Sequence, residues 1–334
     1  MRVMEEERML LSVIIPFYNS EEFLAECVES VVNEPVRDME ILLLDDGSTD
    51  NSAEVAYRME GQYSAVKYHK LVHNGVSAAR NDGLDWATGK YVFFLDADDR
   101  IEKGLLTALL EKMEVHNAVM GNSLLREFGC GHKLHCTKES EIPDVLEAGE
   151  TIQEFLAGRN SLRAIGGKMM LRQKVGDSRF RTDLTVGEDT CFIYDFIKNG
   201  WAKTVFVKDL YYEYRMHNRN TIISVNAACF HSQMTVRQYL YDRECERVGA
   251  TKAAAIWIQN ADFLRAWMRR CCKQVKEMPE LRGAILEQIK RMQEHPLYAQ
   301  RGRRFRLEVF AFVHMFPVYK LFFLQRMRMK VSDL

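Results

Sequence analysis

Short apolar runs alternate with helical patterns along the N-terminal part of the chain. The apolar runs predict strands at residues 11–15, 40–44, 65–69 and 91–95. Pro16 is expected to end the first of them. Helical spacing is seen from Phe23 to Val32, from about Asn51, and from Ser77 as N-cap to Trp86, with Gly89 closing that helix. This alternation predicts an α/β fold, a mostly parallel sheet flanked by helices with right-handed crossovers.

The pattern changes after Asp99. Residues 119–128 and 132–138 are expected to pair as a hairpin, and residues 160–185 form a less regular stretch typical of a loop that faces a substrate. A helix is expected near Gly187. Other elements are predicted at 148–157 (helix), 202–207 (strand), and 227–248, 252–275 and 281–294 (helices). We therefore expect an α/β domain at 8–220, a helical C-terminal extension at 221–300 and a separate segment at 301–334.

The segment at 301–334 is basic and rich in aromatic side chains. Between Arg301 and Lys330 it carries eight Arg and Lys residues but one acidic residue, Glu308. Its uninterrupted apolar stretches are shorter than the roughly 20 residues that cross a bilayer. Such a segment suits an anionic membrane surface, here through residues 301–330. Packing on the core, or on a second subunit of a homodimer, remains open, because periodicity does not name the partner.

Composition narrows the class of protein. The chain has 334 residues, 47% of them hydrophobic, which is enough for a large core. Its net charge of −1 argues against a nucleic-acid partner. The acidic N-terminus has no apolar signal stretch, so the eight cysteines are expected to be reduced thiols of a cytoplasmic protein. Attachment to the inner face of the cell membrane would be peripheral.

One cluster of cysteine and histidine residues has the side-chain types that bind metals but not the spacing of a known metal site. It consists of Cys130, His132, His135 and Cys136, and it matches no standard zinc pattern. We interpret it as the tip of the predicted hairpin and expect no zinc there.

The run Asp96-Ala97-Asp98-Asp99 directly follows the apolar strand candidate at 91–95. Open α/β sheets bind ligands at the carboxyl ends of their strands. Clustered carboxylates repel one another unless a cation joins them, and their oxygens suit Mg²⁺ or Mn²⁺. The alternative is a polar turn in which Asp99 caps the next helix.

Four segments should meet at this edge of the sheet. They are residues 16–19, 45–50, 75–81 and 96–99. Together they have the chemistry to hold a nucleotide diphosphate. Asp46 would accept hydrogen bonds from a base or ribose, and a metal at Asp98 would neutralise phosphate charge. The helix start that carries Ser77 and Arg80 would support the negative ligand, or Arg80 would pair with neighbouring carboxylates.

These segments resemble family 2 of the inverting glycosyltransferases, which adopt the GT-A fold. Residues 13–19, 45–50 and 94–99 carry the resemblance, which extends over roughly two thirds of the chain. It implies a nucleotide-diphosphate sugar as donor and Mn²⁺ or Mg²⁺ as cofactor. Among the donors, a UDP-sugar is favoured. The implied donor contacts are Pro16, Tyr18, Asn19 and Asp46 on the nucleotide side and Asp96 near the ribose or sugar. The metal falls to Asp98 or Asp99, and Asp98 is favoured because it completes Asp96-x-Asp98.

Gly187-Glu188-Asp189 resembles the acidic motif of this family at a helix start. The resemblance implies that Asp189 is the base that takes the proton of the acceptor hydroxyl. The alternative is that both carboxylates only complement a helix dipole. The acceptor implied by the family is a saccharide or a lipid-linked glycan in bacterial polysaccharide or glycolipid synthesis.

Three further positions are open. The segment Gly166-Gly167-Lys168 resembles a loop of the family that approaches the donor. Lys168 would either contact a phosphate or be a solvated lysine. His217 stands where related enzymes carry a late basic group, as a metal or phosphate contact or as a structural histidine. His73 stands where asparagine is more usual, which puts the local donor contacts in doubt.

Three other functions compete. A sugar-phosphate nucleotidyltransferase would need a Gly-rich, Arg-containing loop after the first strand, and a dehydrogenase would need Gly-x-Gly-x-x-Gly there, but Pro16-Phe17-Tyr18-Asn19 occupies that position. A protein that binds nucleotide sugars without catalysis would be free to lose Asp98 and Asp189, and both are present.

Overall fold

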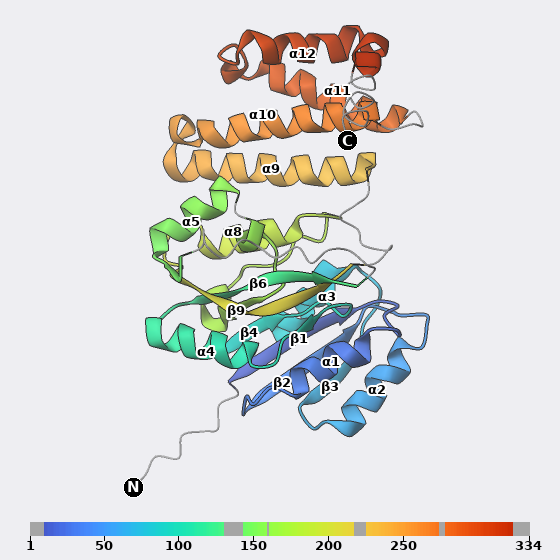
Figure 1. Cartoon of the computed structure of the whole chain (residues 1–334), viewed down its shortest axis with the longest axis vertical. Coiled ribbons are helices and arrows are strands. Elements are labelled where there is room, and N and C mark those ends of the chain that lie inside the picture. The colour runs from blue at the N-terminus through green and yellow to red at the C-terminus, as the bar shows by residue number, and fades with distance from the viewer. Residues whose placement is uncertain (1–9, 130–142, 159, 217–224, 274–277, 323–334) are drawn as a thin grey trace, which may run out of the picture. The chain divides into compact units, whose positions relative to one another are not determined.

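The structure, a computed structural model, describes residues 10–129, 143–158, 160–216, 225–273 and 278–322 (Figure 1). The chain divides into two compact units. The first comprises residues 1–183 and 188–220, and the second comprises 184–187 and 221–334. Residues 301–322, predicted as part of a separate segment, lie in the second unit.

The first unit is built on four parallel strands. In spatial order they are β3 (Val66–Lys70), β2 (Met39–Asp45), β1 (Leu11–Phe17) and β4 (Tyr91–Phe94). The helices α1 (Leu24–Val32), α2 (Ser52–Gln62) and α3 (Val76–Trp86) connect them in chain order. The predicted α/β fold is thereby confirmed. The prediction that Pro16 ends the first strand is wrong, because Leu44 pairs with Pro16 and Asp45 with Phe17, so only one ladder donor is lost.

The sheet continues beyond β4 with strands of both directions. Next to β4 lies β8 (Lys168–Leu171), then β6 (Met120–Phe128), and both of these contacts are antiparallel. β9 (Thr204–Arg215) runs parallel to β6, and the short β5 (Arg100–Ile101) and β7 (Val145–Leu146) pair antiparallel with β9. The expectation of a loop at 160–185 is corrected in part, because this stretch contains β8 and two helices, Asn160–Arg163 and Arg172–Val175. Each has four residues, too few for a period to show in the sequence.

Helices cover both faces of this sheet. Val13, Ile15 and Leu43 share one core with apolar side chains of α1, α2 and α4 (Leu105–His116). On the opposite face, Gly83 of α3 lies so close to Ile14 and Leu44 that a Cβ would come within 2.7 Å of both. Phe192 of α8 (Glu188–Ile197) contacts Phe94 on that same face. The strands are therefore buried on both sides, as their continuous apolar runs indicate.

Three predicted caps differ from the structure. α3 begins at Val76 after Gly75, whose φ is 87°, so Ser77 lies inside the first turn rather than before it. The helix ends at Trp86, and Gly89 lies further on, where a Cβ would come within 2.6 Å of the Ser12 amide nitrogen. Asp99 does not cap α4, because that helix begins only after Gly104.

The remaining short helices of the first unit are α5 (Ala148–Ala157), α6 (Asn160–Arg163) and α7 (Arg172–Val175). α5 has the predicted bounds and begins with a capping box between Glu147 and Glu150. The predicted hairpin strand at 132–138 and the Cys130–Cys136 cluster lie outside the described residues.

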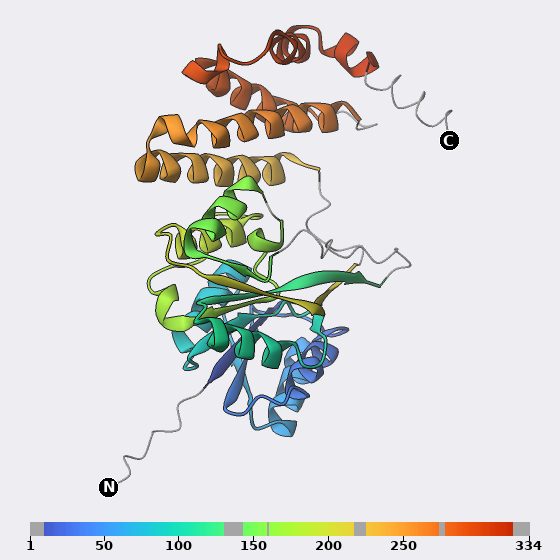
Figure 2. The ribbon, with the colours of Figure 1, turned by 60° about the vertical axis from the view of Figure 1, so that its left-hand side comes forward.

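The second unit is helical. Its elements are α9 (Ala227–Val248), α10 (Ala250–Lys273), α11 (Pro279–Glu294), the 3-10 helix η3 (Pro296–Tyr298), α12 (Arg303–His314) and a helical turn region at 316–322. α9 and α10 run side by side and are joined at Gly249, whose φ is 85° (Figures 1 and 2). The predicted helices are confirmed. Within the described part of the chain, every helix is too short or too polar to span a bilayer.

Glu40 on β2 is a buried carboxylate whose oxygens are both hydrogen-bonded. Oε1 accepts from Ser12 Oγ at 2.7 Å and from Thr88 Oγ1 at 2.6 Å, and Oε2 accepts from Lys67 Nζ at 2.8 Å. Burial alone would raise the pKa of Glu40, but the hydrogen bonds from Lys67, Thr88 and Ser12 outweigh it and lower the pKa to about 2. The carboxylate therefore stabilises the fold in its charged form.

We expect Glu40→Gln to lower the free energy of unfolding by about 2 kcal/mol at pH 7. Because the folded pKa lies below the unfolded value of about 4.3, this difference is complete above pH 5 and is lost as the pH falls towards 2. Urea unfolding at several pH values measures it, with Glu54→Gln on the exposed side of α2 as the control. A constant difference between wild type and Glu40→Gln across this range would contradict the assignment.

Candidate active site

The site lies where the strand order of the first unit reverses. β1 has β2 on one side and β4 on the other, and the chain reaches β4 only after it has formed β2 and β3. Such a switch point leaves a crevice at the carboxyl ends of the two strands. Tyr18 and Asn19 follow β1 there, and Asp96 to Asp99 follow β4.

Arg80 of α3 joins three carboxylates from separate parts of the chain. Its Nη2 donates to Asp96 Oδ1 at 2.7 Å, and its Nη1 donates to Glu188 Oε1 and to Asp189 Oδ1, both at 3.0 Å. The guanidinium is buried and lies 5.3 Å from the centre of the Phe180 ring. Burial disfavours its charge, but the three carboxylates outweigh this and raise the pKa of Arg80. Of the two roles expected for Arg80, the structure shows the pairing with carboxylates.

Asp189 lies in the first turn of α8, and both of its oxygens are held. Arg80 contacts Oδ1, and the Ile165 amide donates to Oδ2 at 3.1 Å. Burial raises the pKa of Asp189, Arg80 opposes the rise, and Glu188 and Asp96 add to it, so that the pKa is about 7. A carboxylate that titrates near neutral pH is suited to accept a proton during a reaction. Its place at a helix start also agrees with the dipole alternative.

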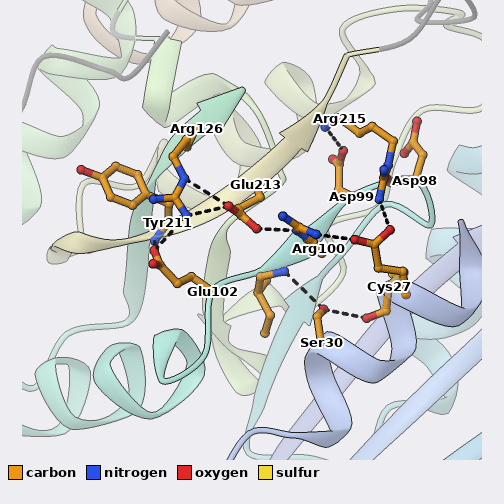
Figure 3. Close-up of polar contacts among 12 residues, drawn as sticks. Cys27, Ser30, Asp98, Asp99, Arg100, Glu102, Arg126, Tyr211, Glu213 and Arg215 are labelled. Atoms are coloured by element: carbon orange, nitrogen blue, oxygen red, sulfur yellow. Dashed lines mark hydrogen bonds and ion pairs between the residues drawn. The ribbon is translucent and has the colours of Figure 1, made fainter. Parts of the chain in front are cut away.

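Asp99 and Asp98 differ in what their side chains do (Figure 3). Asp99 is buried, and its oxygens accept from Tyr212 Oη at 2.6 Å and from the Arg215 amide at 2.8 Å. Burial, with repulsion from Asp98 and Asp96, raises the pKa of Asp99. Asp98 is half-buried, and its backbone carbonyl accepts from Arg215 Nε at 2.7 Å. Asp99 therefore ties the segment from Asp96 to Asp99, which we call the acidic loop, to β9, and Asp98 is less buried than Asp99.

A ladder of alternating charges holds this loop against α1 and β9 (Figure 3). Arg215 Nη2 donates to Glu26 Oε2 at 2.5 Å, and Arg100 pairs with the other oxygen of Glu26. Arg100 Nε donates to Glu213 Oε2 at 2.5 Å, and Arg126 Nη2 donates to Glu213 Oε1 at 2.6 Å. The acidic loop is thus fixed by charged side chains from four elements.

Asp46, which follows β2, is buried and organises the turn before α3. Its Oδ1 accepts from the Asn74 amide at 2.8 Å, and its Oδ2 accepts from the Gly75 amide at 2.9 Å. The predicted contact of Asp46 with a base or ribose stays a prediction. The structure adds a second role, because these two bonds place the start of the helix that carries Arg80.

Two exposed rings stack beside this turn. The Tyr18 and His73 rings have centroids 4.5 Å apart and an interplanar angle of 29°. His73 Nδ1 lies 2.8 Å from the Asp46 carbonyl oxygen, so the histidine that replaces the expected asparagine is anchored. Asn19, with φ of 51°, accepts from the Thr49 amide at 2.8 Å. The segments that follow β1, β2 and β3 are therefore interlocked at one edge of the sheet.

Pro16, Ser77 and Lys168, predicted as donor contacts, are buried in the first unit. Lys168 is completely buried, and its Nζ donates to the Ala164 carbonyl. Burial lowers the pKa of Lys168 to about 7, although Asp189 opposes the shift. The expectation of a solvated lysine is wrong, because the side chain has no exposed surface, and its contact with a phosphate stays a prediction. All three residues therefore belong to the buried interior of the first unit.

Tyr212 and the Ile165 amide are parts of the site that sequence reasoning misses. Tyr212 Oη accepts from the Asp96 amide at 3.2 Å and donates to Asp99, so one buried phenol spans the acidic loop. Its only sequence signal is the aromatic run 211–214 at the end of a strand, which is equally typical of a core strand. A backbone amide such as that of Ile165 leaves no sequence signal.

The donor set is compatible with a divalent cation but does not form a complete cage. Within the described ranges, no group of three or more His, Cys, Asp or Glu side chains is arranged to hold a metal. Mg²⁺ and Mn²⁺ sites that bind phosphates need only one or two protein carboxylates, so Asp98 as a metal ligand stays a prediction. His217, expected as a further ligand or phosphate contact, lies outside the described residues.

Comparison with known proteins decides the family. The profile of glycosyl transferase family 2 matches residues 12–180, which is half of the chain. The chain belongs to this family. Within this family 2 member, the matched residues include Asp46, Arg80 and the acidic loop after β4. Asp189 lies beyond them, and the contact with Arg80 brings it to the family-matched part.

Relatives and solved structures agree with this assignment. The cholesterol galactosyltransferase of Borreliella burgdorferi is 29% identical over 226 residues, covering 64% of this chain and 63% of that protein. The first three curated relatives are matched over only 38–63% of their own length.

Two solved structures share the GT-A fold. S. aureus TarS 1-349 in complex with UDP-GlcNAc has a TM-score of 0.66 at 20% identity, over 83% of this chain and 79% of that one. The mannosyltransferase PcManGT from Pyrobaculum calidifontis, in complex with GDP-Man and Mn²⁺, has a TM-score of 0.52 at 14% identity, over 98% and 88%. Identities this low show the fold of the family 2 member alone.

Proposed function

We propose that this family 2 member is an inverting hexosyltransferase. It moves a sugar from a nucleotide-diphosphate sugar to the hydroxyl of a saccharide or lipid-linked acceptor. The favoured donor is a UDP-sugar, and the product belongs to cell-surface polysaccharide or glycolipid synthesis. The observation that carries the proposal is the contact of Arg80 with both Asp96 and Asp189, because it brings the donor-side and acceptor-side motifs to one guanidinium. The UDP-GlcNAc complex of TarS and the galactosyltransferase relative support the donor class and a lipid-type acceptor.

The proposed reaction uses Asp189 as general base. The acceptor oxygen attacks the anomeric carbon as the bond from that carbon to the diphosphate oxygen breaks, and the hydroxyl proton moves to Asp189. Arg80 and the Ile165 amide each hold one carboxylate oxygen, so the base is oriented before the acceptor arrives. Attack opposite the leaving diphosphate inverts the anomeric configuration.

A divalent cation, Mn²⁺ or Mg²⁺, would be held by Asp98. When bound, it would neutralise charge on the diphosphate. Asp99 would contribute indirectly, because its hydrogen bonds to Tyr212 and to the Arg215 amide fix the loop. The Mn²⁺ in the PcManGT complex supports this assignment.

We expect Asp98→Asn to weaken Mn²⁺-dependent UDP binding by about tenfold or more, which is about 1.4 kcal/mol. The reason is that Asp98 is half-buried, whereas Asp99 is buried and Asp96 is paired with Arg80. Titration calorimetry with UDP, with and without Mn²⁺, measures the effect, and Asp209→Asn, an exposed carboxylate of β9, is the control. Equal affinities of wild type and Asp98→Asn in Mn²⁺ would remove Asp98 from the metal site.

The rate of transfer should depend on the protonation of Asp189. Because the pKa of Asp189 is raised to about 7 and the base must be unprotonated, the rate should fall about tenfold per pH unit below pH 7. A pH profile of kcat at saturating donor and acceptor measures it, with UDP binding over the same range as the control for site integrity. A profile that stays flat from pH 8 to pH 5 would exclude Asp189 as the titrating base.

A donor screen tests the function itself. Thermal shifts with UDP-, GDP- and dTDP-sugars and Mn²⁺ should identify the donor, since a bound ligand raises apparent stability. NMR of the product then gives its anomeric configuration. Release of pyrophosphate from a nucleoside triphosphate and a sugar phosphate would instead indicate a nucleotidyltransferase. Donor binding without hydrolysis or transfer to any acceptor would indicate a binding protein.

A further inference from the structure

The last helices of the second unit have two apolar faces, one buried and one exposed. The buried face consists of Phe305, Val309, Phe312 and Tyr319, and Arg265 of α10 lies 5.6 Å from the centre of the Phe305 ring. The other face exposes six large apolar side chains, which we call the C-terminal apolar strip: Leu307, Phe310, Met315, Val318, Leu321 and Phe322. Each is between 46% and 59% exposed. The question left open by the sequence is thus answered in part, because one face is buried in the unit and the other is exposed.

The strip is unusual within the described part of the chain. Thirteen large hydrophobic side chains are exposed there, and six of them fall between residues 307 and 322. Single exposed apolar side chains are ordinary, but a contiguous set marks an interaction surface. Leu307 and Phe310 are one helical turn apart on α12, and Val318 and Leu321 repeat that spacing after the break at Met315.

The exposed charges of α12 itself have one sign. Arg303, Arg304 and Arg306 are exposed on α12. Glu308, the one acidic residue between 301 and 322, is half-buried and accepts from Arg269 Nε at 2.7 Å and from Tyr319 Oη at 3.0 Å. Its charge is therefore matched inside the unit, and the exposed face is basic.

We propose that the C-terminal apolar strip and the arginines beside it form a docking surface for a bilayer that contains anionic phospholipids. The α12 helix has 12 residues, so it would lie in the plane of the interface rather than cross the membrane. The leucine and phenylalanine side chains would enter the acyl boundary, while the arginine side chains extend their guanidinium groups to lipid phosphates. This inference goes beyond the proposed function and does not depend on it.

A second copy of this chain is a poorer occupant. In a two-fold dimer the same surface lies on both sides of the interface, so the interface would gather Arg303, Arg304 and Arg306 from both copies, which are six like charges. The described part of the segment offers no unmatched carboxylate to offset that repulsion. A lipid phosphate layer supplies the missing negative charge together with an apolar phase.

Co-sedimentation of the full chain with vesicles tests the proposal, without any sugar donor. The vesicles are made of phosphatidylcholine alone or of phosphatidylcholine with phosphatidylglycerol. We expect binding to the mixed vesicles that weakens with salt. The double variant Leu307→Gln, Phe310→Gln should lower the partition coefficient at least about tenfold, and Arg303→Gln, Arg304→Gln should lower it and flatten the salt dependence. The matched control is Val72→Gln, Val115→Gln, which changes two exposed valines of the first unit.

Thermal unfolding confirms that each variant is folded, and light scattering gives the oligomeric state. No binding of wild type to the mixed vesicles, or equal binding of the strip variant and the control, would overturn the proposal. A dimer of the wild type that Phe310→Gln dissociates would assign the strip to self-association and would also overturn it. Loss of vesicle binding with unchanged donor affinity would support it, and a failed donor screen would leave this result untouched.

Discussion

Replacement of Asp189 by asparagine is expected to lower kcat for sugar transfer by about 10²- to 10⁴-fold, the contribution typical of a general base. Asparagine keeps the shape of the side chain, but its one amide oxygen accepts from only one of the two donors, Arg80 or the Ile165 amide, and it does not take a proton from the acceptor. UDP affinity should therefore change by less than about threefold, or 0.7 kcal/mol. Single-turnover transfer and titration calorimetry give the two quantities.

Glu188→Gln is the matched control for this variant. Glu188 contacts the same Arg80 Nη1 at the same distance of 3.0 Å as Asp189 does, so its replacement removes a comparable charge from the same cation. If Asp189 is the base, Glu188→Gln keeps kcat within about tenfold of wild type. Equal losses in the two variants would show that the charge around Arg80, and not proton transfer, determines the rate.

Arg80→Met is expected to cost about 3–5 kcal/mol of unfolding free energy at pH 8, the range for breaking a buried ionic group on one side. Methionine fills part of the space but leaves Asp96, Glu188 and Asp189 without the cation that holds them. The unfolding free energy of Arg80→Lys should lie between those of Arg80→Met and wild type. The lysine ammonium keeps the charge but lacks the planar fork that contacts the three carboxylates at once. Urea unfolding measures the three proteins.

The pH dependence of this loss has a defined sign. Arg80 opposes the rise in the pKa of Asp189, so without Arg80 this pKa rises further above its unfolded value, and the folded variant binds more protons than the unfolded chain. Its stability relative to wild type should then recover as the pH falls from 8 to 5. The control is Arg179→Met, which breaks an exposed pair with Asp85 and should cost less than about 1 kcal/mol. A loss for Arg80→Met no larger than for Arg179→Met would contradict the role of Arg80.

The first half of the fold follows from local pattern. β1, β2 and β4 are buried on both faces, so their apolar runs stand out, and the intervening helices show a helical period. β8 is not recognisable in the sequence, because a strand of four residues is too short to show a period. Its place between β4 and β6 depends on partners distant in the chain. The long C-terminal helices are readable because each spans at least four turns.

By itself, the sequence determined the α/β order, the helical extension and the acidic loop after β4, since each of these is a local pattern of residue types. Only the tertiary structure decided which residues act together. Arg80 meets Asp189 across 109 positions of sequence, and Asp99 meets Tyr212 across 113. Composition and period carry no information about such contacts, because the positions are brought together only when the sheet and helices pack. Tertiary packing also decides that Lys168 is buried and that α12 exposes one of its apolar faces.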